Sequence, residues 1–223
     1  MEELIKIAEK IRNDELREKV IELLKNPRPL LMDFKDSIEF EESPASKRRH
    51  HSYERGLIIH TLATTKIALA LSDILEEMYD VKINRDVIIA ASLLHDVFKY
   101  ITYIQAEDGR FKRSKLGERI DHLSLIIGEL YLRKFPLEVI HAVIAHHGKS
   151  SPIEPRTIEA LLVHMADRTD AEINDEVLFA ARDIIKECTG RDLEVLPKGI
   201  SAFKIIAAKE RGGCEEVRKM LGM

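Results

Sequence analysis

Tryptophan is absent from this chain, and glycine, proline and aromatic residues are scarce: its 223 residues include 10 Gly, 7 Pro and 5% aromatics. A β-sandwich of this length would need many turns rich in Gly and Pro, so the composition favours helices. Hydrophobic residues make up 45% and charged residues 33%, which is typical of a globular and not a disordered chain. A chain of this length can bury one sizeable hydrophobic core.

Cysteine is equally scarce. Cys188 and Cys214 have no CxxC spacing, so we expect neither a disulfide framework nor a zinc–thiolate site. The N-terminus shows no basic segment followed by an apolar one, and we therefore expect no signal peptide. The longest apolar stretch, 57–75, contains a histidine and charged residues, which argues against a membrane span. These absences predict a cytoplasmic protein with no membrane contact.

Positive charge is not in excess. The net charge is -4 and the pI about 6.2, whereas a dedicated nucleic-acid binder usually has a basic balance, so long nucleic acid is not an expected partner. The basic run 47–51 could hold a phosphate or a polyanion, but a solvated loop is the simpler interpretation for Lys47 and Arg48. A single Gln and abundant Lys, Glu and Ile are typical of a thermophile.

Apolar residues recur at helical spacing along most of the chain. We expect helices over 2–25 with a break at Asn13, over 56–79, from Asn84 to about Phe98, near 121–134, 136–146 and 155–169, and two or three more over 175–223 around a loop at 190–198. Residues 100–120 are the one region typical of irregular or β structure, with a hairpin turn at 107–110. Pro136 suits a first helical position, and Gly148 suits the position after a helix end.

No long linker divides the sequence, and the mixed segment 30–52 is expected to wrap over the core. We therefore predict a single domain spanning 1–223. Its core would cover about 50–170, with helical extensions at 1–49 and 171–223.

Five of the nine histidines lie on predicted helices among apolar residues, where Leu or Ile would be usual: His60, His95, His122, His146 and His147. Asp96 and Asp167 occupy similar positions. Charged groups that point into an apolar core are costly unless they are paired or bind a metal, and imidazole with carboxylate suits Fe, Mn, Zn or Co. One such His alone is more often a hydrogen-bonded core residue, but the ordered series of His and Asp is hard to explain by chance.

This series resembles the HD superfamily of metal-dependent phosphohydrolases. The family's basic pattern is matched by His60, His95, Asp96 and Asp167. The extra histidines of members that hold two metals are matched by His122, His146 and His147. The resemblance covers about 50–170 and implies an all-α HD-domain helical bundle with helical additions at both ends. It also implies two divalent ions, Fe2+ or Mn2+, bridged by Asp96, with the other residues of the basic pattern at one ion and the extra histidines at the other.

The stretches 51–60 and 146–171 look similar to those of bacterial 3'-5' exoribonucleases that carry an HD domain. One departure is Arg55, where that branch tends to have Gly, and this changes what packs near the substrate. Those exonucleases carry a further nucleic-acid-binding domain, which nothing here resembles. Among members with small substrates, the chain resembles archaeal iron-dependent enzymes that open dihydroneopterin 2',3'-cyclic phosphate in methanopterin biosynthesis.

Two polar residues are candidates for catalysis. Lys99 lies three residues after Asp96 and shares its face on a continuing helix. In related HD proteins a Lys at this position contacts phosphate; the alternative is a surface Lys. Asp121 would either orient His122 or donate a proton to the leaving oxygen, and the alternative is a helix N-cap.

Two further residues, His51 and Arg55, lie close to His60 in the sequence and are predicted substrate contacts. His164 is either a partner of a metal ligand or, more simply, a hydrogen-bonded core residue, and His141 is interpreted as structural.

We therefore predict a metal-dependent phosphodiesterase that hydrolyses a small, cyclic, nucleotide- or pterin-like phosphoester by metal-activated water. The first alternative is a 3'-5' exoribonuclease, which the net charge of -4 disfavours because a polymer needs many phosphate contacts. The second is a non-catalytic metal- or ligand-sensing HD domain, which the full set of ligands disfavours. The sequence leaves a homo-oligomer open.

Overall fold

The computed structural model describes residues 1–30, 37–107, 109–193, 195–197 and 199–223. Parts of three sequence-based expectations lie outside these residues: 31–36 of the mixed segment, Asp108 of the hairpin turn, and Glu194 and Lys198 of the C-terminal loop.

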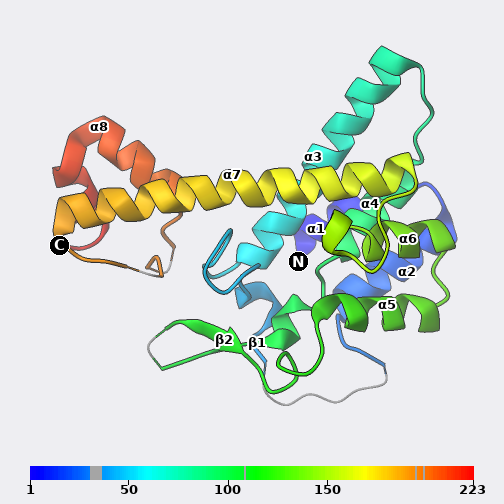
Figure 1. Cartoon of the computed structure of the whole chain (residues 1–223), viewed down its shortest axis with the longest axis horizontal. Coiled ribbons are helices and arrows are strands. Elements are labelled where there is room, and N and C mark those ends of the chain that lie inside the picture. The colour runs from blue at the N-terminus through cyan, green and yellow to red at the C-terminus, as the bar shows by residue number, and fades with distance from the viewer. Residues whose placement is uncertain (31–36, 108, 194, 198) are drawn as a thin grey trace.

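Helices dominate the described residues, and the sheet is a single small hairpin (Figure 1). The α-helices are α1 (Glu2–Ala8), α2 (Asp14–Lys25), α3 (Gly56–Tyr79), α4 (Arg85–Leu94), α5 (His122–Leu132), α6 (Leu137–Ile144), α7 (Ile158–Thr189) and α8 (Ala202–Met220). The 3-10 helices are η1 (Phe40–Glu42), η2 (Lys99–Thr102) and η3 (Gly148–Ser150). Strands β1 (Tyr103–Gln105) and β2 (Phe111–Arg113) pair antiparallel. The predicted all-α class and the hairpin are confirmed.

Side-chain caps explain where several helices begin. In each case a side-chain oxygen accepts a hydrogen bond from the backbone N–H three residues later, which satisfies a donor that has no partner inside the helix. The capping residues are Asn13 for α2, Asn84 for α4, Asp121 for α5, Thr157 for α7 and Ser201 for α8.

Some predicted boundaries are wrong. Helix α4 ends at Leu94 instead of Phe98, so His95 is its C-cap. Pro136 precedes α6 as its N-cap, and α6 ends at Ile144, so Gly148 opens η3 instead of closing that helix. A larger difference is α7, one helix of 32 residues where the sequence indicated a break near 170–174. Two polar residues there, Asp170 and Asn174, are buried and accept hydrogen bonds from His51 and His60, and the helix continues through them.

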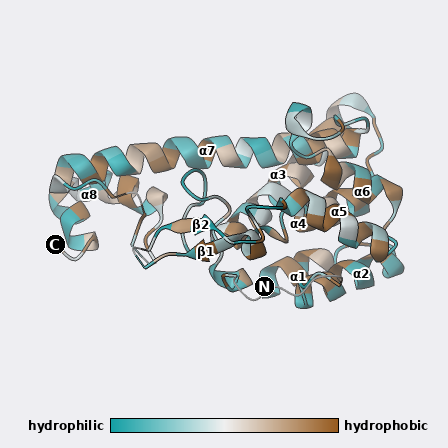
Figure 2. Ribbon diagram, turned by 60° about the horizontal axis from the view of Figure 1, so that its bottom comes forward, coloured by the Kyte–Doolittle hydropathy of each residue, from teal (hydrophilic) through white to brown (hydrophobic). Residues whose placement is uncertain are grey.

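Helix α7 connects two hydrophobic clusters. The larger cluster combines α1 to α6 with the first part of α7, and the smaller one combines the second part of α7 with α8. Figure 2 shows α7 along one edge of the molecule, with α8 at its C-terminal end and the other helices gathered at its opposite end. Helix α3 is long and apolar enough to cross a membrane, but in this fold it packs against α4 and α7 as a core helix.

The C-terminal cluster contains a disulfide between Cys188 of α7 and Cys214 of α8, with their Cα atoms 4.9 Å apart. The expectation that the cysteines form no disulfide is therefore wrong. The two residues are 26 positions apart, and only the packing of α8 on α7 brings them together.

Candidate metal centre

Asp96 lies at the centre of a buried cluster of histidines. Its Oδ2 is 3.4 Å from the Nε2 atoms of both His60 and His95. Its Oδ1 is 3.1 Å from Nε2 of His122 and 3.8 Å from Nε2 of His146. The two oxygens of one carboxylate therefore face two different sets of imidazoles.

These side chains form two compact groups of possible ligands. One group is His60, His95 and Asp167, and the other is Asp96, His122, His146 and His147; within each group the ligand atoms lie within 4.8 Å of one another. Five separate segments supply them: the second turn of α3, the ends of α4 and α6, the start of α5, and α7. Delivery of one or two ligands from each of several helices is a recurrent way to build a metal site in a helical core. All seven residues in these two groups were predicted from the sequence.

The donor atoms fit a metal ion. Oδ1 of Asp96 and the Nε2 atoms of His122 and His146 are buried without a hydrogen-bond partner. Buried polar atoms without a partner are rare in proteins, and each one needs a physical explanation. Coordination of a divalent ion by carboxylate and imidazole explains these three atoms together.

Backbone carbonyls fix the tautomer of two candidate ligands. Nδ1 of His95 lies 2.8 Å from the carbonyl oxygen of Ser92, and Nδ1 of His146 lies 2.7 Å from that of Val143. Because a carbonyl can only accept, Nδ1 carries the proton in both rings. In the neutral ring the Nε2 lone pair is then directed at the cluster, as a metal ligand requires.

His60 is held by a chain of side-chain hydrogen bonds that runs away from the cluster. Its Nδ1 is 2.6 Å from Oδ2 of Asp170, the same oxygen is 2.7 Å from Nε2 of His51, and His51 Nδ1 is 2.7 Å from the hydroxyl of Tyr53. Burial raises the pKa of Tyr53 to about 12, so its hydroxyl stays protonated and can donate to His51. Burial also lowers the pKa of His51, so the neutral ring then donates from Nε2 to Asp170.

The carboxylate in this chain was missed by the sequence analysis. Burial would raise the pKa of Asp170, but hydrogen bonds from His51 and His60 lower it to about 2, so it remains an acceptor. The signal was present, because Asp170 follows Asp167 by three residues and thus shares its helix face. Asn174, one turn further on, also accepts a hydrogen bond from the His51 backbone N–H at 2.5 Å.

The loop before α3 is fitted closely to this arrangement. A Cβ atom on Gly56 would lie 2.0 Å from the carbonyl oxygen of His51, so only glycine allows the loop to pack there. His51 is consequently buried with both ring nitrogens engaged, which differs from the expected substrate contact. Its neighbour His50, which the sequence analysis did not single out, is half-buried with its ring centroid 5.3 Å from that of His60. Burial lowers the pKa of His50 to about 3.

Lys99 lies beside the central carboxylate, as its spacing predicted. Its Nζ is 2.5 Å from Oδ2 of Asp96, and only 8% of the residue is exposed. Burial would lower the pKa of Lys99, but the charge of Asp96 raises it, so the amine stays protonated. Burial would raise the pKa of Asp96. The charges of Lys99 and His95 outweigh this effect and hold the pKa of Asp96 well below its usual value.

Asp121 caps α5 and accepts a hydrogen bond from the Ser124 backbone N–H at 2.7 Å. Burial would raise the pKa of Asp121, but the bonds from Ser124 outweigh it and lower that pKa, so the carboxyl is ionised at neutral pH. This geometry matches the N-cap interpretation, with Asp121 placing the first residue of α5, His122, at the cluster.

Two remaining histidines have structural contacts. His164 Nδ1 donates to the carbonyl oxygen of His146 at 2.6 Å, and a Cβ on Gly148 would lie 2.5 Å from the His164 ring. His164 therefore supports the turn that carries the double histidine. His141 accepts a hydrogen bond from the Arg156 backbone N–H at 3.0 Å, as expected for a structural residue.

Comparison with known proteins agrees with this geometry. The family model of the HD domain matches residues 57–172, and the chain belongs to this family of metal-dependent phosphohydrolases. The dihydroneopterin 2',3'-cyclic phosphate phosphodiesterase of Methanocaldococcus jannaschii is 47% identical over 218 residues, which cover 96% of this chain and 85% of that protein.

More distant similarity is found to bacterial 3'-5' exoribonucleases named YhaM. The protein of Listeria welshimeri is 32% identical over 164 residues, and that of Bacillus subtilis is 28% identical over 153 residues. These matches cover 68% and 63% of this chain but only 50% and 46% of the exoribonucleases, so the chain spans about half of their length. No solved structure matches the chain.

Proposed function

We propose that this protein hydrolyses a small cyclic phosphodiester, dihydroneopterin 2',3'-cyclic phosphate, with two divalent ions, Fe2+ or Mn2+, as cofactors. The observation that carries the catalytic part is the position of Asp96, whose two oxygens face separate groups of histidines. The similarity to the Methanocaldococcus jannaschii enzyme supports the substrate, since it extends over nearly the whole chain and not only over the HD domain.

The proposed ligands divide between the two ions. His60, His95 and Asp167 would hold one, His122, His146 and His147 the other, and Asp96 would be shared. When bound, such ions lower the pKa of water and neutralise charge on phosphoryl oxygens.

The protein's own groups complete the site. Lys99 donates to a non-bridging phosphoryl oxygen, because its ammonium group lies next to the bridging carboxylate. Asp121 positions His122, while His51 acts through Asp170 on His60 instead of touching the substrate. Arg55 contacts the substrate from the start of α3. In the reaction, water adds to phosphorus, one ring P–O bond breaks, and the leaving oxygen takes a proton, which yields a phosphomonoester.

A 3'-5' exoribonuclease is the second candidate, and one observation favours it. Lys47, Arg48, Arg110 and Lys112 surround a small basic pocket of about 130 Å³, where RNA phosphates could bind. The net charge of -4 and the short extent of this basic surface favour the small substrate.

The test is a metal analysis of anaerobically purified protein followed by hydrolysis assays. The substrates are dihydroneopterin 2',3'-cyclic phosphate, 2',3'-cyclic AMP, an aryl phosphodiester and single-stranded RNA. We expect two ions per chain and the highest kcat/KM for the pterin ester. Rapid end-wise shortening of RNA that weakens steeply with salt would reverse the order of the two candidates.

We also propose one domain over 1–223, with a core of about 50–170, a cytoplasmic location and a homo-oligomer. Helices α1 and α2 share the larger hydrophobic cluster, which supports a single domain. The disulfide is compatible with the cytoplasm of a hyperthermophile, where intracellular disulfides are common. The end of α3 offers a surface for self-association through its exposed apolar residues, Ile74, Met78 and Tyr79.

A further inference from the structure

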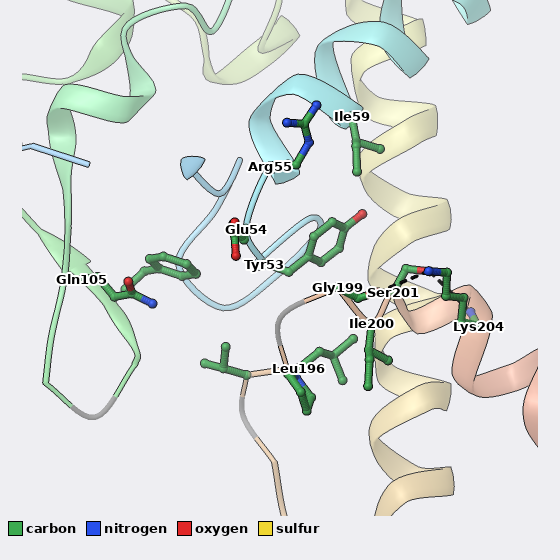
Figure 3. A pocket seen from close by; sticks show the side chains of 13 residues that line it. Tyr53, Glu54, Arg55, Ile59, Gln105, Leu196, Gly199, Ile200, Ser201 and Lys204 are labelled. Atoms are coloured by element: carbon green, nitrogen blue, oxygen red, sulfur yellow. Dashed lines mark hydrogen bonds between the residues drawn. The ribbon is translucent and has the colours of Figure 1, made fainter. Parts of the chain in front are cut away.

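A cavity of about 560 Å³ lies beside the N-terminal end of α3 (Figure 3). Its walls come from three parts of the chain: residues 53–59, the hairpin of β1 and β2, and residues 195–197 and 199–204, which lead into α8. None of the seven proposed metal ligands lines it. Small-molecule sites usually measure roughly 300–1,000 Å³, and a phosphate group alone would leave most of this space empty.

The walls combine apolar surfaces with a polar rim. Tyr53, Phe111 and Leu196 are buried, and together with apolar neighbours they line the interior. Gln105 and Arg55 are exposed at the rim and carry amide and guanidinium groups. A planar heteroaromatic ring has the matching character, because its faces are apolar and its edge donates and accepts hydrogen bonds.

The cavity is connected to the metal centre by direct contacts. The wall residue Tyr53 is hydrogen-bonded to His51, and the chain continues through Asp170 to the proposed ligand His60. A second wall residue, Ile59, immediately precedes His60 on α3. Because Ile59 and His60 are consecutive residues, the cavity adjoins the segment of α3 that carries a proposed ligand, on the side of His60 that faces Asp170.

The backbone at the rim is also unusual. Arg55 has φ +65°, in the left-handed region that favours glycine. A non-glycine residue there is strained, and such strain concentrates at ligand sites. Arg55 thus keeps a strained backbone conformation at the edge of the cavity, where its guanidinium group can contact an anionic substrate.

We propose that this cavity binds the heteroaromatic ring of the substrate, a pterin, while the cyclic phosphate lies at the metal centre. The assignment rests on the proposed function and names the part of the chain that determines specificity. Residues 195–197 and 199–204, which form one wall, lie outside the HD domain at 57–172, so ring recognition is supplied by the C-terminal addition.

Binding of neopterin, which has the ring but no phosphate, tests this without turnover. Its fluorescence is titrated with protein that has been freed of metal by a chelator. We expect saturable binding to the wild type and at least a tenfold loss of affinity in Ile59→Asp and in Ile200→Asp, which place a charge on opposite walls. Ile158→Asp is the matched control, because Ile158 is exposed to the same extent as Ile59 but lies at the start of α7 and does not line the cavity; it should bind neopterin as the wild type does.

Circular dichroism and thermal unfolding show whether each variant is folded, and the two wall variants stand as independent tests. No saturable neopterin binding by the wild type, or wild-type affinity in both folded wall variants, would overturn the proposal. Tighter binding of adenosine than of neopterin would overturn the assignment to a pterin. Hydrolysis of the pterin ester by the wild type is measured separately. Hydrolysis without cavity-dependent neopterin binding removes only the cavity proposal, and cavity-dependent binding without hydrolysis removes only the proposed function.

Discussion

Asp170 Oδ2 lies 2.6 Å from Nδ1 of His60, on the side of the imidazole opposite to the metal cluster. The carboxylate accepts the Nδ1 proton and thereby keeps the His60 Nε2 lone pair directed at Asp96 and Asp167. Metal affinity should therefore depend on a residue that would touch no metal.

Asp170→Asn tests this dependence, because the amide keeps the shape but removes the charge. Loss of such a partner typically lowers metal affinity about 10–100-fold, and we expect a loss of this size with the fold retained. Metal titration of chelator-treated protein measures it. Glu172→Gln, an exposed change on the same helix, is the control and should bind metal normally. Equal metal affinity in Asp170→Asn and Glu172→Gln would show that Asp170 has only a packing role.

Metal stoichiometry distinguishes the shared ligand from a single-ion ligand. We expect two ions in the wild type, one in His122→Ala, and weakened binding of both in Asp96→Ala, because one carboxylate faces both groups. Elemental analysis after anaerobic reconstitution gives the counts. A wild type that saturates at one ion would remove His122, His146 and His147 from the ligands, and normal turnover in Asp96→Ala would exclude an HD-type mechanism.

Asp121→Asn separates capping from proton donation. Asparagine is as good an N-cap as aspartate, so stability and the position of His122 should be preserved, whereas Asp121→Ala should cost about 1 kcal/mol. We expect kcat within about twofold of the wild type in Asp121→Asn, since the lowered pKa of Asp121 leaves it ionised at neutral pH and unable to donate a proton. A large fall in kcat, with unchanged thermal unfolding, would restore the general-acid role.

Lys99→Ala should affect turnover more than substrate binding. The Lys99 ammonium group lies where charge grows on the phosphoryl oxygens, and removal of one such electrostatic donor costs on the order of a hundredfold in kcat. We expect a smaller rise in KM and two bound ions, with partial recovery in Lys99→Arg because charge is restored without shape. Steady-state kinetics on metal-loaded protein measure these changes. Wild-type kinetics with both ions present would leave Lys99 as a structural counter-ion of Asp96.

The sequence predicted the residues of the candidate metal centre better than the residues that surround it. The ligands were identifiable because each places a polar group where a helix would bury Leu or Ile, a signal carried by one residue and its neighbours. Asp170 gave only its spacing from Asp167, and His50 gave no such local signal, since their contacts depend on the folding of the loop before α3. The continuity of α7 was missed for the same reason: Asp170 and Asn174 are polar, and only the folded loop shows what satisfies them.

The cavity and the disulfide were beyond sequence reasoning because both require segments distant in the chain to meet. Residues 53–59 and 195–204 are separated by almost the whole HD domain, and no periodicity links them. Cys188 and Cys214 likewise meet only when α8 folds back on α7.

Arg55 allows backbone strain and substrate contact to be measured separately. Arg55→Gly removes both the left-handed penalty and the guanidinium group, whereas Arg55→Ala removes the guanidinium group and keeps the penalty. Relief of the strain should make Arg55→Gly about 1 kcal/mol more stable than Arg55→Ala, which corresponds to roughly 2–4 °C in Tm for a chain of this size. Lys134→Gly, at another left-handed residue away from the cavity, should gain stability with unchanged kinetics.

Loss of the Arg55 guanidinium group should raise KM for the pterin ester by a similar factor in Arg55→Gly and Arg55→Ala, since both variants lack the same charge at the rim. Thermal unfolding and steady-state kinetics on the same samples measure the two effects. If Arg55→Gly is more stable and keeps the wild-type KM, the arginine does not contact the substrate, and its strained conformation has another cause. A raised KM in both variants, with higher stability only in Arg55→Gly, would show that this position gives up stability for substrate binding.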